Sequence, residues 1–470
     1  MKHIRQHDEN PQSWLIFVRG IRGFSLGMIA GGVGLIASAV AANDAPFQPI
    51  AAGKWHTVAI KADGSLWAWG RNEWGQLGDG DGNMEGKSSP VPIGSGDRWL
   101  AVAAGLYHTV ALKADGSLWA WGWNSYGQLG INFIDITNQP VQMGLDRDWR
   151  AVVAGSRHTV ALKTDGSLWT WGNNEYGQLG IGNTKPQFSP VQVGTNHDWR
   201  AVAAGRNYTV ALKTNGSLWA WGDNEYGQLG IGTTKSTNQP VQVGTDQDWR
   251  AVVAGFSHTM ALKTNNTLWA WGNNRSGNLG VPAGYPPEEH SPVQVGASHD
   301  WQAVAAGEIY TVALKTDNTL WAWGGNNVGQ LGIGSTSAQS SPVQVVTDQD
   351  WQTVTSGGSH TVALKTDGSL WVWGFNDYGQ VGNGTTETQY SPTPIWPSQL
   401  PKFTNITRLP NGQIQLDVEG PTNVVYRVLG SANLLDWQEI GILTNATGSA
   451  SSQDTTAPNL HRRFYRLEQP

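Results

Sequence analysis

The stretch that decides the fold is His158–Gly172, which reads His-Thr-Val-Ala-Leu-Lys-Thr-Asp-Gly-Ser-Leu-Trp-Thr-Trp-Gly. Apolar residues alternate with others on both sides of an Asp-Gly pair, which is the pattern of a β-hairpin. An Asp-Gly pair favours a two-residue type I′ turn, because both central residues need a positive φ. Closely similar stretches occur seven times along the chain. The hairpin is therefore the unit from which the protein is built.

The turn predicts a register for this hairpin. A two-residue loop at 165–166 places Leu162 opposite Trp169, and two residues further along it places Val160 opposite Trp171. Directly opposed residues lie on the same side of a sheet, so these four large residues should share one face. The other face is expected to hold Ala161, Thr170, Leu168 and the stem of Lys163. A sheet with one bulky and one small face buries both by stacking on copies of itself.

The repeat length indicates a β-propeller. The glycine before each His-Thr or Tyr-Thr pair recurs every 50 or 52 residues, at Gly53, Gly105, Gly155, Gly205, Gly255, Gly307 and Gly357. A period near 50 with short strands is typical of one propeller blade per repeat. In the third repeat, the four strands are expected at Trp149–Ala154, Thr159–Thr164, Ser167–Trp171 and Pro190–Val193. The repeats begin near 47, 99, 149, 199, 249, 301 and 351, and Phe47 replaces the tryptophan that opens the later ones.

The tryptophan content follows from the repeats. Of 26 tryptophans, the Leu-Trp-x-Trp-Gly motif holds Trp67, Trp69, Trp119, Trp121, Trp169, Trp171, Trp219, Trp221, Trp269, Trp271, Trp321, Trp323, Trp371 and Trp373. We expect these residues to pack between blades. We therefore predict an all-β protein, with a seven-bladed propeller at 43–397 and a small β-sandwich-like module at 398–470. The sequence does not show which strand closes the ring.

The C-terminal module has its own strand pattern. Strands are expected at Phe403–Leu409, Gln413–Val418, Val424–Leu429, Gln438–Leu443 and Arg463–Leu467, with Trp437 as a core anchor. Its segments 431–437 and 462–467 are similar to C-terminal modules of large exported bacterial proteins. That similarity implies attachment, sorting or adhesion, and a passive folded cap is the alternative.

The N-terminus predicts export. Basic residues precede an uncharged apolar run at 24–42, and Ala39-Val40-Ala41 offers a cleavage site. Residues 1–42 are therefore a cleaved signal peptide or an N-terminal membrane anchor, which places the protein in the secreted, periplasmic or cell-surface fraction. Loss of residues 1–41 would change the net charge from −6 to −8, since it removes four basic and two acidic residues. The absence of cysteine excludes disulfides and thiolate metal sites.

The repeated motifs carry a family resemblance. Gly-x-x-His-Thr, Leu-Trp-x-Trp-Gly and Gly-Gln-Leu-Gly in constant order resemble the regulator of chromosome condensation repeat family, over about 350 residues. The resemblance implies a seven-bladed β-propeller. The family includes nucleotide exchange factors, a plant ultraviolet-B photoreceptor and enzyme inhibitors, so the resemblance leaves the function open. The photoreceptor has tryptophan directly after the marker glycine in several blades, and this chain has none there. An exchange factor needs the cytosol or nucleus, which the predicted export contradicts.

The loops that differ between blades predict a recognition surface. In an antiparallel blade, the loop between strands one and two and the loop between strands three and four emerge on the same side. Rigid blades that hold variable, aromatic-bearing loops are typical of recognition surfaces, although loops also vary when nothing packs against them. The partner-binding candidates are Lys54, Trp55, Arg71, Leu106, Tyr107, Trp123, Arg157, Arg206, Asp223, Phe256, Glu308 and Phe375.

Recurrent polar residues are interpreted as structural. The histidines at His56, His108, His158, His258 and His360 alternate with Tyr208 and Tyr310, so a hydrogen bond to the adjacent loop explains them better than catalysis. The segment 79–83 resembles the start of a calcium loop, but Met84 and Pro90 break the pattern. No catalytic residue, metal site or cofactor is predicted, and the absence of a Lys/Arg cluster disfavours nucleic acid.

We therefore predict a monomeric, non-enzymatic protein that binds an unknown protein or glycan through one propeller face. The first alternative is an inhibitor of an extracellular enzyme. A guanine-nucleotide exchange factor and a hydrolase come last.

Overall fold

The structure is a computed structural model that describes residues 15–17, 49–94, 96–132, 135–281, 287–396, 402–411, 413–419, 424–431, 438–445, 449–455 and 463–468. The chain divides into two compact units, Gly32–Trp396 and a second that combines Met1–Gly31 with Pro397–Pro470. No described residue belongs to a helix long and apolar enough to cross a membrane. Apart from β1 (Leu15–Phe17), the predicted export segment lies outside the described residues.

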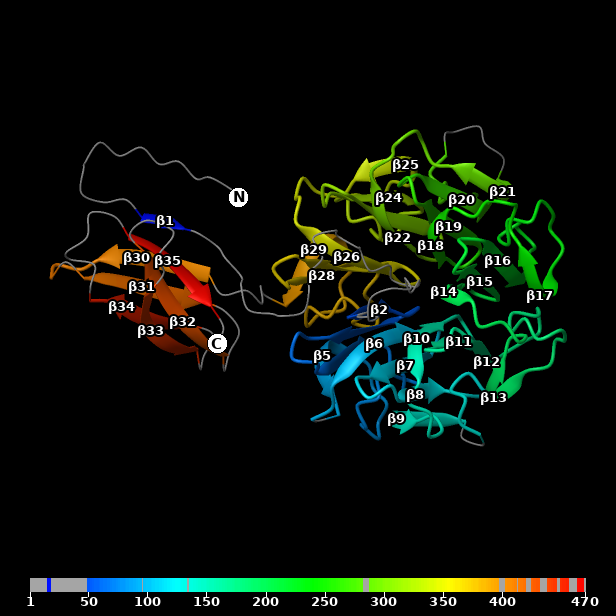
Figure 1. Cartoon of the computed structure of the whole chain (residues 1–470), viewed down its shortest axis with the longest axis horizontal. Coiled ribbons are helices and arrows are strands. Elements are labelled where there is room, and N and C mark those ends of the chain that lie inside the picture. The colour runs from blue at the N-terminus through cyan, green and yellow to red at the C-terminus, as the bar shows by residue number, and fades with distance from the viewer. Residues whose placement is uncertain are drawn as a thin grey trace. The chain divides into compact units, whose positions relative to one another are not determined.

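The propeller consists of seven four-stranded antiparallel sheets around a common centre (Figure 1), each built from four consecutive strands. The innermost strands are β2 (Ile50–Ala52), β6 (Trp99–Ala104), β10 (Trp149–Ala154), β14 (Trp199–Ala204), β18 (Trp249–Ala254), β22 (Trp301–Ala306) and β26 (Trp351–Ser356). The second strands are β3 (His56–Ile60), β7 (His108–Lys113), β11 (His158–Lys163), β15 (Tyr208–Lys213), β19 (His258–Lys263), β23 (Tyr310–Lys315) and β27 (His360–Lys365). The third strands are β4 (Leu66–Gly70), β8 (Leu118–Trp123), β12 (Leu168–Gly172), β16 (Leu218–Gly222), β20 (Leu268–Asn273), β24 (Leu320–Gly324) and β28 (Leu370–Gly374). The outermost strands are β5 (Lys87–Ile93), β9 (Ile136–Gln142), β13 (Gln187–Gln192), β17 (Thr237–Gln242), β21 (Glu288–Gln294), β25 (Gln339–Gln344) and β29 (Gln389–Trp396).

The hairpin of β11 and β12 has a three-residue loop, so the predicted register is wrong by one residue. Lys163 N donates to Ser167 O at 3.1 Å, and Gly166 N donates to Lys163 O at 3.1 Å. Gly166 has a φ of 81°, as the third residue of such a loop requires. A shift of one residue in the pairing moves every side chain to the opposite face.

The shift regroups the side chains of the blade. Ala161 pairs with Trp169, and Leu162 pairs with Leu168. The motif tryptophans therefore share a face with small residues rather than with the aliphatic ones. The tryptophan face holds Thr159, Ala161, Trp169 and Trp171, and the aliphatic face holds Val160, Leu162, Leu168 and Thr170.

The tryptophan face of each blade packs against the aliphatic face of the preceding blade. Trp221 of the fourth blade packs with Val160 and Leu162 of the third, and Trp171 packs with Leu112 of the second. The second motif tryptophan is fully buried in every joint, at Trp69, Trp121, Trp171, Trp221, Trp271, Trp323 and Trp373. The first is partly buried, at Trp67, Trp119, Trp169, Trp219, Trp269, Trp321 and Trp371. The blades thus stack through unlike faces, with a different division of residues from the predicted one.

Each joint also contains a buried polar network. Between the second and third blades, Trp171 Nε1 donates to Gln128 O at 3.0 Å, and Thr159 Oγ1 donates to the same oxygen at 2.7 Å. Because the threonine proton is used there, His108 Nε2 must donate to Thr159 Oγ1, 3.1 Å away. The histidines thus bond the threonine of the next blade rather than the adjacent loop. In two joints, the hydroxyl of Tyr208 or Tyr310 donates to the next blade's carbonyl oxygen instead.

Two glycine positions of the motif are required by these contacts. The ring of His158 lies against Gly155, and a Cβ at Gly155 would overlap it. The indole of Trp221 lies against Gly180 in the same way, and Gly180 also has a φ of 69°. The recurrent glycines therefore give the buried rings their space.

The ring closes without a shared strand. The first blade is β2 to β5 and the seventh is β26 to β29. The joint between them repeats the internal network, because His360 Nε2 lies 2.9 Å from Thr57 Oγ1, which donates to Gln380 O at 2.8 Å. Gly358 N also donates to Gly53 O at 3.3 Å. The same bonds that join neighbouring blades thus join the two ends of the ring.

Trp396, at the end of β29, fills the first blade's missing tryptophan position. Its ring centroid lies 6.5 Å from that of Trp67 and 5.9 Å from that of Trp69, at interplanar angles of 75° and 63°. In the second blade, the opening tryptophan, Trp99, makes the equivalent contacts at 6.2 and 6.1 Å, with angles of 79° and 65°. Lys61 lies over Trp67 and Trp396, as the corresponding lysines lie over their own tryptophan pairs. The last strand of the ring therefore completes the core of the first blade.

The second unit is a small module of two sheets. One contains β30 (Lys402–Arg408), β31 (Ile414–Glu419) and β34 (Ser449–Asp454), and the other contains β1, β35 (Arg463–Glu468), β32 (Val424–Ser431) and β33 (Gln438–Asn445). Leu416, Val418 and Tyr426 form its core together with Val428, Leu443 and Tyr465. Strand β34 was not predicted, because its serine-rich sequence lacks apolar alternation. Trp437 lies outside the described residues.

Candidate functional site

The variable loops of each blade are joined on one face of the propeller. Arg71 N donates to Trp55 O at 2.9 Å, and Trp123 N donates to Tyr107 O at 2.9 Å. Equivalent bonds occur in the other blades, for example from Phe375 N. The second residue after each marker glycine and the residue after each Trp-Gly therefore lie side by side on this face.

The first variable position surrounds the mouth of the central channel. The channel has a cavity of about 120 Å³, lined by the innermost strands and by Lys54, Leu106, Ser156, Arg206, Phe256, Glu308 and Gly358. Lys54 Nζ lies 3.5 Å from Glu308 Oε1. The guanidinium carbon of Arg206 lies 4.4 Å from the Phe256 ring centroid, and Lys54 Nζ lies 5.6 Å from it. Two cations thus flank one aromatic ring at the mouth, with one carboxylate beside them.

The aromatic side chains of the seventh, first and second blades form a continuous band, which we call the aromatic crescent. Its members are Phe375, Tyr378, Trp55, Tyr107, Trp74, Trp123 and Tyr126, all partly buried. Successive ring centroids lie 6.1, 5.8, 5.4, 5.9, 5.5 and 5.3 Å apart. The rings therefore support one another across two joints between blades.

Two arginines complete the crescent. The guanidinium carbon of Arg71 lies 4.7 Å from the ring centroids of both Trp55 and Tyr378, and Arg71 forms an ion pair with Glu73. Arg157 of the third blade lies 5.6 Å from the Trp123 ring centroid and 5.0 Å from that of Tyr126. A cation over an aromatic face contributes about 0.5–1 kcal/mol at exposed sites and more where it is desolvated. These contacts hold the crescent in a defined shape.

The predicted residues fall into three groups. Trp55, Arg71, Tyr107, Trp123, Arg157 and Phe375 meet in the crescent, Lys54, Leu106, Arg206, Phe256 and Glu308 meet at the channel mouth, and Asp223 lies with neither group. Sequence reasoning missed Trp74, Tyr126 and Tyr378. They precede the glycine of the Gly-Gln-Leu-Gly motif, where an aromatic recurs in five blades. Because of that recurrence they were interpreted as part of the structural motif. Their rings nevertheless lie partly exposed on the face.

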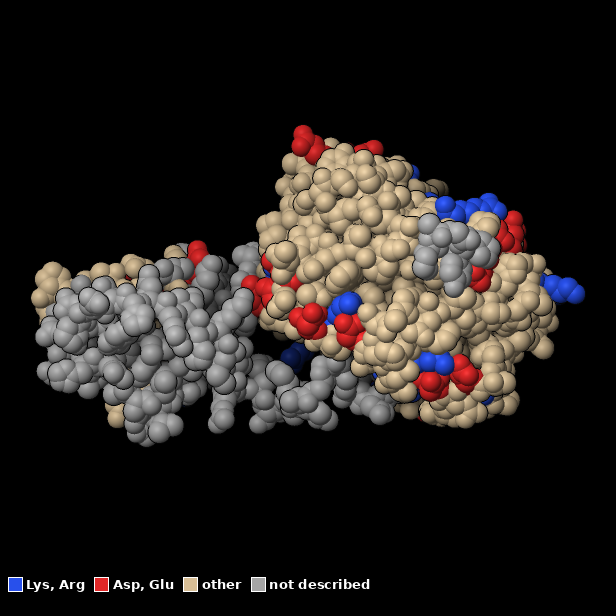
Figure 2. Space-filling model, turned by 90° about the horizontal axis from the view of Figure 1, so that it is seen from above, with Lys and Arg blue, Asp and Glu red and all other residues tan. Residues whose placement is uncertain are grey.

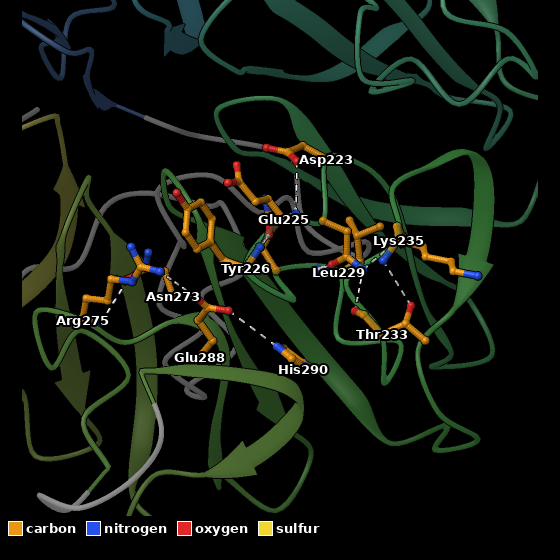
Figure 3. A network of polar contacts seen from close by, with 12 residues as sticks. Asp223, Glu225, Tyr226, Leu229, Thr233, Lys235, Asn273, Arg275, Glu288 and His290 are labelled. Carbon is orange, nitrogen blue, oxygen red and sulfur yellow. Dashed lines mark hydrogen bonds and ion pairs between the residues drawn. The ribbon is translucent and has the colours of Figure 1, made fainter.

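Asp223 belongs to a polar region on the fourth and fifth blades (Figure 3). Its Oδ1 accepts a hydrogen bond from Glu225 N at 3.2 Å, and burial raises the pKa of Asp223. Arg275 lies over the Tyr226 ring and forms an ion pair with Glu288 at 2.9 Å. This side of the face therefore presents charged and hydrogen-bonded groups rather than contacting aromatic rings.

The recurrent histidines lie in the joints between blades. All five are buried, and burial lowers the pKa of each to about 3. They are therefore neutral near pH 7, and the Nε2 proton of each is used in the joint. In the part of the chain that the structure describes, no group of three His, Cys, Asp or Glu residues could hold a metal ion.

The segment that resembles a calcium loop contains its own cation. Lys87 Nζ lies 2.6 Å from Asp81 Oδ2 and 3.9 Å from Asp79 Oδ2. The Asp79 Oδ1 atom accepts hydrogen bonds from Asn72 Nδ2 and Asp81 N, both at 3.2 Å. The lysine ammonium therefore takes the place between the carboxylates that a calcium ion would need.

Charges elsewhere are mostly paired. On the side of the molecule drawn in Figure 2, Lys and Arg side chains lie mostly beside Asp or Glu. In the third blade, Lys163 Nζ lies 2.7 Å from Asp146 Oδ2 and 3.1 Å from Asp148 Oδ1. The described residues on that side therefore form no concentrated positive surface.

Comparison with known proteins agrees with this architecture. The RCC1-like domain matches residues 34–296 and 147–417. The chain belongs to the RCC1-like domain family. Ultraviolet-B receptor UVR8 of Arabidopsis thaliana is 42% identical over 84 residues, which are 18% of this chain and 19% of that protein. Human Protein RCC2 is 42% identical over 76 residues, which are 16% of this chain and 15% of that protein. The matched stretches thus cover about a fifth or less of the length of these two relatives.

Solved structures of other proteins share the fold. Human WBSCR16 aligns with a TM-score of 0.63 and 23% identity, covering 71% of this chain and 94% of that one. Prp20p of Saccharomyces cerevisiae, whose binding to Gsp1p and histones was studied, aligns with a TM-score of 0.65 and 22% identity, covering 76% and 88%. At these identities the likeness establishes the fold of the RCC1-like domain and leaves the partner of this chain open.

Proposed function

We propose that this RCC1-like chain is an exported, non-enzymatic recognition protein, and that it binds a partner protein through the aromatic crescent. The observation that carries the proposal is the crescent itself, in which seven partly buried rings and two guanidinium groups are in continuous contact. Residues that dominate protein interfaces are enriched in Trp, Tyr and Arg, and they cluster in this way. A glycan is the second ligand class, because partly exposed rings also stack on sugars.

The other parts of the proposal rest on separate observations. Export rests on the basic and apolar pattern of residues 1–42. A non-enzymatic role is supported by the neutral, hydrogen-bonded state of the recurrent histidines. A partner of protein class is supported by the family, since Prp20p, which shares this fold, has binding properties toward two proteins or protein classes, Gsp1p and histones.

The test compares partner capture by the full-length protein and by a variant of the crescent. The triple variant Trp55→Ala/Trp74→Ala/Trp123→Ala should lose partners from the secreted and cell-surface fraction, with a drop in affinity of more than 100-fold. Tyr176→Ala is the matched control, because Tyr176 occupies the motif position of Tyr126 on the third blade and is 45% exposed. The control variant should capture the same partners as the unmodified chain.

Two outcomes would contradict the proposal. Capture that survives the triple substitution would place the binding surface elsewhere. Turnover of a substrate that survives purification, and that disappears when one loop carboxylate is replaced, would make the chain an enzyme. One-to-one inhibition of a captured enzyme would instead refine the proposal to the inhibitor alternative.

A further inference from the structure

The polar atoms that the crescent presents are mainly hydrogen-bond donors. The indole N–H groups of Trp55, Trp74 and Trp123 make no hydrogen bond to any described residue, and all three side chains are partly exposed. Both tryptophans of each joint motif differ from them, because each of those indoles donates within the protein, as Trp169 does to Ser167 and Trp171 to Gln128. A ligand that covers the crescent would displace water from these donors, and it must therefore supply acceptors for them.

Arg157 adds a charged donor at one end of the crescent. Its guanidinium lies over two rings, and Nη1 lies 3.4 Å from the Tyr126 hydroxyl. No carboxylate within the described part of the chain forms an ion pair with it. Arg71 differs, because it is already paired with Glu73. A partner carboxylate near the third blade would therefore find an available guanidinium.

The inclination of the rings disfavours a sugar as the ligand. Neighbouring rings in the crescent meet at angles between 39° and 86°. The edge of one ring therefore covers part of the face of the next, as in a packed aromatic cluster. Stacking of successive sugars requires open ring faces that lie along the surface. This surface instead offers inclined ring edges and indole N–H groups.

The fold also disfavours a partner that adds a β-strand. The crescent lies on loops, and the free strand edges of the propeller are on the outermost strands. Each of those strands carries a proline, at Pro90, Pro140, Pro190, Pro240, Pro292, Pro342 and Pro392. Proline on an edge strand blocks the pairing of a further strand. An α-helix is also a poor match, because its backbone carbonyls are already bonded within the helix.

A polyproline II helix meets these requirements. It has no internal hydrogen bonds, so its carbonyl groups stay free to accept them. Proline has no N–H, and so a proline-rich segment brings few donors that the crescent would leave unsatisfied. Pyrrolidine rings also pack into notches lined by aromatic rings, and the segment is already extended before it binds. Three indole donors across two blades therefore match an extended backbone rich in acceptors.

We propose that the crescent binds a proline-rich segment of a partner protein in the polyproline II conformation, with an acidic residue of that segment beside Arg157. This inference rests on the proposed function, and it specifies the chemistry of the partner. The indole N–H groups of Trp55, Trp74 and Trp123 donate to backbone carbonyls of the segment. The rings of the crescent pack against its pyrrolidine rings.

The test uses the full-length protein and a library of fluorescein-labelled twelve-residue peptides with a Pro-Pro-x-Pro core and varied flanks. Fluorescence anisotropy should reveal saturable binding of a subset, and replacing each proline of the best peptide by alanine should weaken binding at least 10-fold. Trp74→Phe/Trp123→Phe keeps the rings and removes two donors, and should also weaken binding at least 10-fold. Tyr176→Phe is the matched control and should leave the affinity unchanged. Arg157→Gln should selectively lower the affinity of peptides with an acidic flank.

Several results would overturn the inference. These are no saturable binding across the library, equal binding of the alanine peptides, and an affinity insensitive to Trp74→Phe/Trp123→Phe. Saturable binding of neutral oligosaccharides in place of peptides would assign the crescent to a glycan. A dimer in sedimentation equilibrium that the same double variant dissolves would show that a second copy covers it. If captured partners depend on the crescent while no peptide binds, this inference fails and the proposed function stands. If peptides bind while capture ignores the crescent, the proposed function fails.

Discussion

The joints between blades and the face above them use the same aromatic side chains in different ways. In the joints, each Trp-x-Trp motif repeats the same partners, so that Trp121 and Trp221 both donate to the carbonyl oxygen of a glutamine in the preceding blade. On the face, no two blades carry the same residues, and the indoles of Trp74 and Trp123 have no partner among the described residues. The indoles of the Trp-x-Trp motifs are thus bonded within the chain, whereas the indoles of Trp74 and Trp123 on the face are not.

This difference separates the residues that packing constrains from those that it leaves free to vary in each blade. A joint residue must fit the next blade, so a single change affects a core that the whole ring shares. A residue on the face contacts only its neighbours in the loops, and it can change with little effect on the ring. The same substitution should therefore affect stability in a joint and binding on the face.

The largest expected effect is unfolding of the joints in acid. The folded-state pKa of each buried histidine is about 3, below the value of about 6.5 in an unfolded chain. The unfolded state therefore binds more protons below pH 6.5, and stability falls as the pH drops from there toward 3. From pH 7 to pH 5 the loss is about 2 kcal/mol per histidine, or about 10 kcal/mol for five, comparable with the whole stability of many domains. Circular dichroism should show cooperative unfolding near pH 5.

The chain offers a control for this prediction. Tyr208 and Tyr310 fill the histidine position in two blades and bond the next blade through their hydroxyls. Replacing several of the five recurrent histidines by tyrosine removes titrating groups from the joints. The acid midpoint should then move to lower pH, and an unchanged midpoint would show that other groups cause the unfolding.

The second effect compares one tryptophan of a joint with one of the face. Trp396→Ala removes a ring that is 8% exposed and completes the core of the first blade. The free energy of unfolding of this variant should be about 3–5 kcal/mol lower than that of the unmodified chain, as for other replacements of buried aromatic residues by alanine. Trp123→Ala removes a partly exposed ring and should cost about 1 kcal/mol or less. Urea denaturation measures both, and Trp396→Phe should recover part of the loss. Equal costs for the two alanine variants would mean that the backbone and threonine bonds close the ring without Trp396.

The propeller and its period could be predicted because the same motifs recur seven times at a nearly constant spacing. The register could not, because Asp165-Gly166 fits both a two-residue turn and the three-residue loop that Thr164 begins. Gly166 is left-handed in either loop, and here at φ 81°; the two loops differ at Asp165, which would need a positive φ in the type I′ turn and does not have one. One ambiguous residue therefore reversed the assignment of both faces.

Closure and the crescent were hidden for different reasons. Trp396 follows the last repeat, and the first repeat has Phe47 where the later ones open with tryptophan, so the sequence signal was one missing and one additional tryptophan. Trp74, Tyr126 and Tyr378 belong to the repeat, and a repeated residue is most simply interpreted as structural. Only the arrangement in space shows that these rings meet Trp55, Tyr107 and Trp123 across two joints. The repeat predicts which blades are neighbours, but it does not reveal which loop side chains touch across the joints.

The smallest effect compares the same glycine substitution in both regions. Gly205→Ala places a Cβ against the buried Tyr208 ring, which is packed on all sides and cannot move without disturbing the next blade. Overpacking of this kind costs about 1–3 kcal/mol. Gly82→Ala lies in an exposed loop, where a Cβ would meet no atom within 4 Å and the backbone φ is not in the left-handed region. Its stability should stay within about 0.5 kcal/mol of the unmodified chain. Thermal melts of the two variants measure the difference, and similar melting temperatures would mean that the joints are looser than their buried rings indicate.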